Sequence, residues 1–340
     1  MGDRSARHAV IVNNVLELVD ALADASTRRI VVAPGRYTLN ASLRVSRSVE
    51  IEAEMPGAML IDAGGSAWRA LIIDPENASD IITLSDLNIT GGYVIGHGGG
   101  VKVQSGMVTL SGCNVYSNSA SDGGGVSVHG GDVTLRNCAI STNSANDGGG
   151  VLISGGTAAL NDCSVHTNQA YQGVGGGIFM LNGTASLSDS QVFSNSADYD
   201  GGGVRIDGGA MTISNCNIRS NRADQYGYGG LGPNVYLDVG GSAIASPCSP
   251  TFVGTYGNLQ YTCPPPAPPL APPRHNYALL VGLGTVGSLA LLCAVGAMAR
   301  CVFIKFCRAK AEDTVVLDIP RGQERALVVQ DSAPALKGDL

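Results

Sequence analysis

Acidic side chains stand directly before three of the glycine triplets in this sequence. These residues are Asp122, Asp147 and Asp200. A column of carboxylates would offer Ca²⁺ the several oxygen ligands that it requires. In the other interpretation these residues lie at corners of the chain, where an Asp side chain accepts backbone hydrogen bonds and the following glycine adopts a positive φ. We favour the corner and expect no bound cofactor, because stacked like charges are unfavourable without a cation.

Tyrosines precede the later glycine turns. Tyr171, Tyr199, Tyr226 and Tyr228 stand in the segments YQGVGGG, DYDGGG and DQYGYGG. Exposed rings in a row are able to stack on sugar rings. The alternative is that the rings shield corners left open by the extra residues found there. Both interpretations stay open, and removing Tyr171, Tyr199 and Tyr226 together would separate them.

Cysteines occupy one position of a repeated pattern at Cys113, Cys138, Cys163 and Cys216, with Ser190 in the remaining place. As small apolar side chains they suit a tight interior, and the nearby histidines lie outside this column, so packing is favoured over metal binding. Stacking in register points neighbouring Cβ atoms in parallel, which is poor geometry for a disulfide. We therefore expect free, buried thiols.

All of these residues belong to one repeated unit, with the consensus G-G-G-V-x-V-x-x-G-x-V-T-L-x-x-C-x-V-x-x-N-S-A-x-D. The residue after each glycine triplet recurs in steps of 25, 25, 27 and 26, at Val101, Val126, Val151, Ile178 and Val204. An asparagine recurs in the same steps, at Asn118, Asn143, Asn168, Asn195 and Asn221. Two landmarks with one spacing indicate one structural coil per repeat, which is typical of a solenoid. We expect the asparagines to form an amide ladder at a corner.

Apolar residues alternate within the unit, which predicts short strands. In one unit the inward pairs are Val126 with Val128, Val133 with Leu135, and Cys138 with Ile140. Three short strands with Gly or Asn corners predict an all-β solenoid, a three-sided parallel β-helix whose inward residues stack about 4.8 Å apart. A degenerate copy at residues 82–92 precedes the clear repeats, so we expect about eight coils over residues 30–245.

The repeats resemble those of chlamydial polymorphic outer membrane proteins, in which a G-G-A-I element alternates with F-x-x-N. The counterparts here are GGGV or GGGI, and V-Y-S-N, I-S-T-N, V-H-T-N, V-F-S-N and I-R-S-N. Val or Ile replaces Phe, and glycine replaces alanine. The phrase IVVAPGRYTLNASLRVSRSVEIEAEMPGAMLIDAGG is also similar to the N-terminal coils of pectin-lyase-like proteins. This resemblance implies a right-handed β-helix displayed on a surface, and it transfers no activity.

Catalysis on polysaccharides needs an acid and a base placed together, or Ca²⁺-binding carboxylates with a basic residue. Gly96-His97-Gly98 matches one triplet of polygalacturonase-like signatures, and the others are missing. The outward strand positions are mixed and show no convergent set: Lys102, Gln104, Ser127, His129, Leu152, Ser154, Arg205 and Asp207. We therefore expect no catalytic residues and no enzymatic activity.

The N-terminal region, residues 1–29, contains a predicted capping helix. Over residues 15–25 the face formed by Val15, Leu18, Val19 and Leu22 is apolar, and Asn14 with Glu17 is placed as a capping box. Such a helix covers the open edge of the first coil. The first ten residues contain no apolar run of a signal peptide, so we expect a truncated start.

The C-terminal part changes in composition several times. Residues 246–263 are expected to form a cap closed by a disulfide between Cys248 and Cys263, which contributes about 3 kcal/mol by loop-closure entropy. Free thiols are the alternative. Residues 264–275 are a proline-rich, stiff stalk. Residues 276–300 include 22 uncharged residues, enough for one transmembrane helix.

Basic residues follow this segment more densely than they precede it, so residues 301–340 are expected to be a cytosolic tail and the β-helix extracellular. Cys301 and Cys307 are candidates for palmitoylation. Four asparagines stand in glycosylation sequons: Asn40, Asn77, Asn88 and Asn182. Together these features predict a single-pass membrane protein on the cell surface.

The net charge of −7 argues against a nucleic-acid partner. A rigid, anchored solenoid is typical of a binding surface. We therefore expect a non-catalytic, adhesin-like or carbohydrate-binding module whose partner is an extracellular carbohydrate or another cell-surface ligand. The alternatives are a polysaccharide lyase or hydrolase acting on acidic glycans, and a passive surface spacer.

Overall fold

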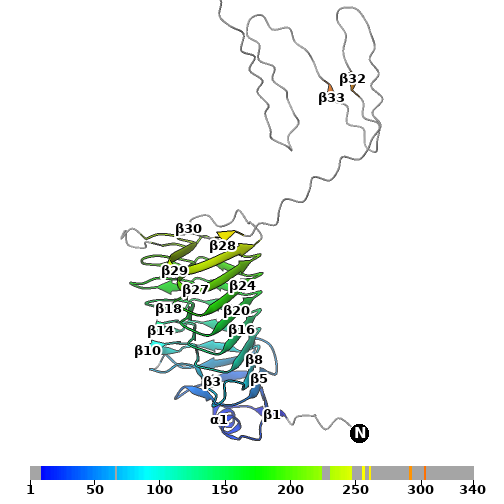
Figure 1. Ribbon diagram of the computed structural model, residues 1–340. Helices are drawn as coiled ribbons and strands as arrows, with labels where there is room; N and C mark the ends of the chain where they lie inside the picture. The colour runs from blue at the N-terminus through cyan, green and yellow to red at the C-terminus, as the bar shows by residue number, and fades with distance from the viewer. Residues whose placement is uncertain are drawn as a thin grey trace, which may run out of the picture. The chain divides into compact units, whose positions relative to one another are not determined.

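The computed structural model describes residues 9–65, 67–223 and 230–246, together with four two-residue strands further along the chain. The chain divides into two units, Met1–Pro265 and Pro266–Leu340. The first unit contains a parallel β solenoid in which successive coils stack along the chain (Figure 1). The second unit is described only at β32 (Leu291–Leu292) and β33 (Val302–Phe303), which pair antiparallel.

Three sheets form the sides of the solenoid. The first has 18 strands: β1 (Ala9–Val12), β2 (Arg29–Val32), β4 (Leu43–Val45), β5 (Val49–Ala53), β7 (Leu71–Ile73), β8 (Ile81–Ser85), β11 (Val101–Val103), β12 (Met107–Ser111), β15 (Val126–Val128), β16 (Asp132–Arg136), β19 (Val151–Ile153), β20 (Thr157–Asn161), β23 (Ile178–Met180), β24 (Thr184–Ser188), β27 (Val204–Ser214), β29 (Val235–Ser246), β30 (Thr255–Tyr256) and β31 (Gln260–Tyr261). Two short strands per coil share this side, and they merge into one long strand in β27 and β29.

The second side takes one strand from each coil, whereas the third takes one strand from each of five successive coils. The second sheet has eight strands: β3 (Gly35–Thr38), β6 (Met59–Asp62), β9 (Asn88–Thr90), β13 (Asn114–Tyr116), β17 (Ala139–Ser141), β21 (Ser164–His166), β25 (Gln191–Phe193) and β28 (Asn217–Arg219). The third has five: β10 (Tyr93–His97), β14 (Ser119–Asp122), β18 (Ser144–Ala145), β22 (Gln169–Ala170) and β26 (Ser196–Ala197). The solenoid has about seven turns, against about eight predicted, because eight stacked strands enclose one turn fewer than their number.

The predicted register is confirmed. Val126, Val133, Leu135, Cys138 and Ile140 all belong to the buried core cluster. Repeats pair residue for residue, with Val126 opposite Val101 on one side and Val151 on the other. Each of these inward side chains therefore packs on its counterpart in the next coil, which excludes water from the interior of the repeats.

The assignment of strands to sides was partly wrong. The predicted strands around Val126 and Val133 lie on one side, joined by a bend. The third side consists of β10 and four short strands that contain Ser, Ala or both, at positions where the sequence predicts a corner. Ala145, Ala170 and Ala197 are buried in this third side. Strands of two to five residues with small side chains carry little β propensity, so stacking between coils determines them rather than local sequence.

The predicted asparagine ladder is confirmed. Asn168 donates from Nδ2 to the Ile140 carbonyl oxygen and to Asn195 Oδ1, both at 2.9 Å. Its Oδ1 accepts from the backbone and side-chain nitrogens of Asn143, both at 3.0 Å. The same pattern runs along the column, and Asn234 extends it beyond the last predicted member.

A strained residue precedes each of the five predicted asparagines of the ladder. Ser117, Thr142, Thr167, Ser194 and Ser220 have φ values between 52° and 56°. Left-handed backbone costs a residue with a Cβ atom about 1–2 kcal/mol. The amide ladder stabilises this corner, because the bonds of each asparagine fix the chain immediately after the strained residue.

The cysteine column contains free, buried thiols, as predicted. Each thiol donates to a carbonyl oxygen of the preceding coil, for example Cys216 to Leu187 at 3.3 Å. Ser190 replaces cysteine in this column and donates to Leu160 in the same way, at 3.4 Å. Burial raises the pKa of Cys216 to about 11.

The capping helix α1 (Val15–Ala23) lies at the first coil and packs against β1, β2 and β4 (Figure 1). Asn14 is its N-cap and accepts from the Glu17 backbone nitrogen at 3.0 Å. In a complete capping box the Glu17 carboxylate would accept from the Asn14 backbone nitrogen, but here it accepts from the Asn13 backbone nitrogen instead. Leu18 and Ala21 are buried, whereas Val19 is exposed and does not belong to the predicted apolar face. Strand β1 was not predicted.

In the part of the chain that the structure describes, no helix has the length and apolar character needed to cross a membrane. The predicted span at 276–300 lies outside the described residues except for β32. The stalk and most of the tail also lie outside them, and in the cap the structure describes only Ser246 and the strands β30 and β31. The transmembrane helix and the disulfide between Cys248 and Cys263 stay predictions.

Replacing Asn168 by alanine should destabilise the solenoid by about 3 kcal/mol or more, because several buried donors and acceptors lose partners worth about 1–3 kcal/mol each. Chemical denaturation of the variant measures this change in unfolding free energy. Asn182→Ala, at an exposed turn, is the matched control and should change it by less than about 0.5 kcal/mol. Equal effects of the two substitutions would contradict the ladder as a stabilising element.

Alkylation of Cys216 at pH 8 should be slower in the folded protein than in the unfolded chain by about a hundredfold or more, because the raised pKa and burial both suppress the thiolate. Mass spectrometry of labelled peptides measures the modification of each cysteine separately. Comparable labelling rates before and after unfolding would show that the column is open to solvent.

Candidate functional site

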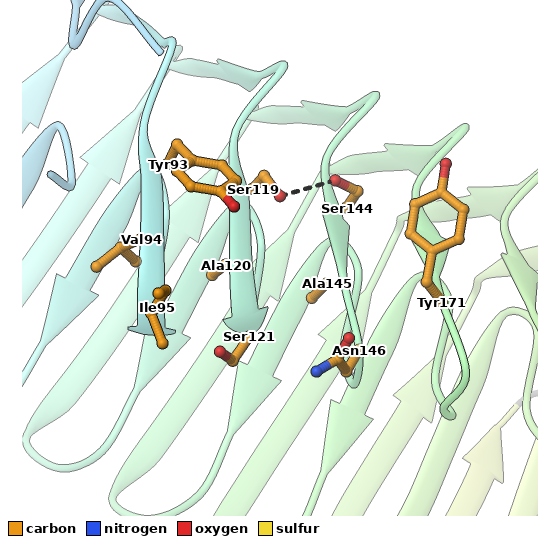
Figure 2. A pocket seen from close by; sticks show the side chains of 10 residues that line it. All are labelled: Tyr93, Val94, Ile95, Ser119, Ala120, Ser121, Ser144, Ala145, Asn146 and Tyr171. Atoms are coloured by element: carbon orange, nitrogen blue, oxygen red, sulfur yellow. Dashed lines mark hydrogen bonds between the residues drawn. The ribbon is translucent and has the colours of Figure 1, made fainter. Parts of the chain in front are cut away.

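A cavity of about 230 Å³ lies on the outer surface of the third side. Strands β10, β14 and β18 and the residues that follow β18 and β22 line it. Figure 2 shows Tyr93 and Tyr171 at its two ends, with Ser119 and Ser144 between them. We call this cavity the tyrosine groove. Its volume is below the ~300–1,000 Å³ typical of pockets that enclose a small molecule, which favours contact with part of a larger ligand.

Small polar side chains form the floor of the tyrosine groove. Ser144 donates to Ser119 across neighbouring coils at 3.1 Å (Figure 2). Ser121 accepts from the Gly96 backbone nitrogen at 3.1 Å, and Asn146 occupies the same position one coil later. Hydroxyl and amide groups therefore recur at the coil spacing of about 4.8 Å along the floor.

Aromatic side chains stand at the rim. Tyr93 is 51% exposed and Tyr171 is 45% exposed. Trp68 is also exposed, and its carbonyl oxygen accepts from the Tyr93 backbone nitrogen at 3.0 Å, so it belongs to the preceding coil. The sequence reasoning missed Tyr93, because this residue stands at the start of a strand rather than beside a glycine triplet.

The predicted tyrosine row is only partly formed. Tyr171 lines the groove, and Tyr199 is exposed on the next coil without lining it. The backbone nitrogen of Tyr199 bonds to Gly173, so Tyr171 and Tyr199 do not occupy the same position in their coils. Tyr226 and Tyr228 lie outside the described residues.

A second surface lies beyond the glycine triplets, on the outer face of β11, β15, β19, β23 and β27. Three outward positions recur in each coil: the residue before the triplet and the residues five and seven places later. They hold His97, Lys102 and Gln104; then Asp122, Ser127 and His129; then Asp147, Leu152 and Ser154; then Val174, Phe179 and Leu181; then Asp200, Arg205 and Asp207. Strand pairing places each position next to its counterpart in the following coil.

The expectation that these residues do not converge was wrong. The rings of His97 and His129 meet edge to face, with centroids 4.8 Å apart. His129 Nε2 lies 3.0 Å from the Ser127 hydroxyl, and Ser127 is fully buried although it lies outside the core cluster. The two imidazoles approach each other because serine is the small residue between Lys102 and Leu152 in its column. We call His97, Asp122, Ser127, His129 and Ser154 the histidine cluster.

Hydrogen bonds determine the tautomer of His129. Ser154 donates its hydroxyl proton to the Val128 carbonyl oxygen at 3.2 Å, so its oxygen accepts from His129 Nδ1 at 3.0 Å. The other ring nitrogen, Nε2, is therefore the acceptor for Ser127. Burial, followed by the charges of Lys102, His97 and Arg69, lowers the pKa of His129 from 6.5 to about 4. The ring is neutral at pH 7.

His97 contacts a carboxylate. Its Nδ1 lies 3.0 Å from Asp122 Oδ2, but the two groups lack the alignment of a hydrogen bond. Asp122 and Asp147 are neighbours across the coils. Burial raises the pKa of Asp147.

The last coil of this surface carries an ionic network. Arg205 pairs with Asp200 at 2.8 Å and Asp207 at 2.5 Å, and it reaches Asp238 at 3.4 Å. Its guanidinium group also lies 4.7 Å from the centre of the Tyr236 ring. One sequence signal was available for the histidine cluster and for the ionic network of Arg205. The residue before each glycine triplet and the residues five and seven places after it share one surface in every coil.

Two of the three acidic residues before the glycine triplets, Asp147 and Asp200, act as corner acceptors. Asp147 Oδ1 accepts from the Val174 backbone nitrogen at 2.9 Å, and Asp200 Oδ1 accepts from Leu231 at 2.7 Å. Among the described residues, no three His, Cys, Asp or Glu side chains are grouped to hold a metal ion. The preference for a corner over Ca²⁺ agrees with these contacts, and the absence of a cofactor stays an expectation.

The sequence over residues 70–243 matches the family described as "Right handed beta helix region". The chain belongs to the right-handed β-helix family. The matched part of this β-helix includes the tyrosine groove, the histidine cluster and the ionic network of Arg205. No curated protein matches the chain. The likeness of its repeats to the chlamydial proteins stays a prediction.

The predicted modification sites of the β-helix differ in accessibility. Asn40, Asn77 and Asn182 are exposed. Asn88 donates to Gly57 and Met59 carbonyl oxygens at 3.0 and 2.9 Å, so a glycan on this amide would disturb both bonds. Cys301 and Cys307 lie outside the described residues.

The His129 imidazole should make stability depend on pH. Its folded pKa of about 4 lies below the ordinary 6.5, so its contribution is complete above pH 6.5 and is lost as the pH falls toward 4. His129→Gln should make this decline shallower, by at most about 1.4 kcal/mol per pH unit and by less in practice because the ring is only half-buried. Denaturation curves between pH 4 and pH 7 measure the difference. Parallel profiles for the two proteins would contradict a depressed pKa.

Proposed function

We propose that this β-helix is a non-catalytic binding module whose tyrosine groove binds an extended carbohydrate on the cell surface or in the extracellular space. The observation that carries the proposal is the groove itself, with two exposed tyrosines at its ends and a floor of serine, alanine and asparagine. It lies on a rigid scaffold, so little conformational entropy is lost on binding.

The chemistry of the tyrosine groove suits a sugar polymer. Tyrosine combines an apolar ring face with a hydroxyl group, which allows contact with both the faces and the hydroxyls of sugars. The floor offers hydrogen-bonding groups repeated from coil to coil, and a polymer of repeated units laid across the coils meets the same groups in each. Small floor residues leave room for a ring between Tyr93 and Tyr171.

The cellular setting belongs to the same proposal. Residues 276–300 would anchor the protein in a membrane, and residues 264–275 would hold the β-helix away from that membrane. The apolar character of the first segment and the prolines of the second support this arrangement.

A polysaccharide-degrading enzyme is the second candidate, because the histidine cluster brings titratable and hydroxyl groups together. Incubation of the full chain with acidic glycans, followed by assay of reducing and unsaturated ends, tests it. Release of such ends, and its loss in His129→Gln, would favour catalysis over binding alone.

Replacing Tyr93 and Tyr171 together by alanine should weaken glycan binding about tenfold or more, taking about 0.5–1.5 kcal/mol for each aromatic contact. A glycan array identifies a binding sugar for the full chain, and titration calorimetry with that sugar measures the affinity. Unfolding free energy should change by less than about 0.5 kcal/mol, because both rings are exposed.

Two single substitutions are controls for this experiment. Tyr116→Ala removes a tyrosine from β13 on the second side, and Tyr199→Ala removes one near the groove that does not line it. Both should retain binding. Equal glycan affinity of the double variant and the wild type would exclude the groove as the binding site. A loss of affinity in the Tyr199 variant equal to that of the double variant would instead support a binding row that includes Tyr199.

A further inference from the structure

Two half-buried cations lie beside the histidine cluster without a charged partner. Within the described part of the chain, neither Arg69 nor Lys102 forms an ion pair, and the Lys102 side chain donates no hydrogen bond. Arg69 donates from Nε to the His97 carbonyl oxygen at 2.6 Å, which leaves its terminal nitrogens available. Partly buried charges are normally paired, so this pair calls for a counter-ion.

The fold holds these cations close to one another. Lys102 stands next to Ser127 in the paired strands β11 and β15, and the rings of His97 and His129 cover that serine. The bond from Arg69 fixes its guanidinium group at the end of β10. Gly96 has a φ of 141°, and a Cβ atom there would lie 3.1 Å from an Arg69 terminal nitrogen, so glycine keeps this space open.

Two carboxylates beside this site already have other partners. Asp74 pairs with Arg44 at 2.8 Å, and Asp122 contacts His97 at 3.0 Å. Burial lowers the pKa of Lys102, the charge of Arg69 lowers it further, and the charge of Asp74 opposes the shift only in part. Burial also lowers the pKa of Arg69. The site is therefore locally cationic in a chain whose net charge is −7.

We propose that Arg69, Lys102 and the edge formed by His97 and His129 bind one oxyanion group, a carboxylate, sulfate or phosphate. The planar guanidinium group of Arg69 matches two oxygens of such a group, and the Lys102 ammonium adds a compact charge. A bound oxyanion would compensate both cations at the corner between the third and first sides, where His97 ends β10 and Lys102 lies on β11. None of these four residues lines the tyrosine groove, so this inference goes beyond the proposed function.

Titration of the full chain with sodium sulfate, phosphate or acetate tests the site, with sodium chloride at equal ionic strength as reference. Imidazole C–H resonances of His97 and His129 report binding by NMR. At least one oxyanion should give saturable shifts and raise the pKa of His129 from about 4 toward 6.5. Saturation by acetate identifies a carboxylate site, and saturation by sulfate or phosphate alone identifies a tetrahedral oxyanion site. Shifts that match those of chloride in all three titrations would overturn the proposal.

A charge-matched pair of variants locates the effect. Lys102→Gln should weaken oxyanion binding about tenfold or more, since charge-assisted hydrogen bonds contribute about 1.5–3 kcal/mol. Arg136→Gln removes the same charge from an exposed position on β16 and should leave binding unchanged. Equal losses in the two variants would show a general effect of net charge and overturn the site.

A further variant separates this inference from the proposed function. The Tyr93→Ala, Tyr171→Ala double variant should lose carbohydrate binding and keep the saturable oxyanion shifts. Loss of those shifts in this variant, with the fold intact by circular dichroism, would overturn the independence of the two surfaces. Arg69→Lys keeps the charge but loses the planar fork, and oxyanion affinity equal to that of the wild type would contradict the role of Arg69.

Discussion

The buried asparagine ladder is the interaction on which the solenoid depends. Each coil turns from one side to the next at a corner where a residue with a Cβ atom adopts a positive φ. The side chain of the following asparagine bonds to the coils on both sides, so one residue type satisfies the corner and sets the register. Since register decides which side chains point inward, the valine, leucine and cysteine columns follow from the same bonds.

Inward and outward positions obey different constraints. The interior accepts only side chains that stack on their counterparts, and Ser190 shows how narrow this choice is, since it keeps the hydrogen bond of the cysteine that it replaces. Outward positions vary from lysine to phenylalanine to arginine within one column, at Lys102, Phe179 and Arg205. Close approach of His97 and His129 arises only where serine separates them, and the ionic network of Arg205 arises only where aspartates flank it.

The period of the sequence was sufficient to predict the parallel solenoid, its inward residues, the amide ladder and the free thiols, because each depends on spacing that repeats along the chain. The third side was missed because strands such as Ser144–Ala145 are formed by stacking rather than by local preference. The exposure of Val19 and the position of Tyr93 at the groove were also missed, because both depend on contacts with other parts of the chain. The histidine cluster was missed because its members come from three coils, and reading each coil separately gives no indication that the rings of His97 and His129 meet.

The separation between the repeated interior and the variable exterior has an evolutionary consequence. Because successive coils pair residue for residue, duplication or loss of one whole coil leaves every hydrogen-bonded column continuous. The outward side chains of that coil are gained or lost as a set, and residues that were two coils apart become neighbours. A protein built in this way acquires new surface chemistry by changing its number of coils, without first solving a new packing problem in its core.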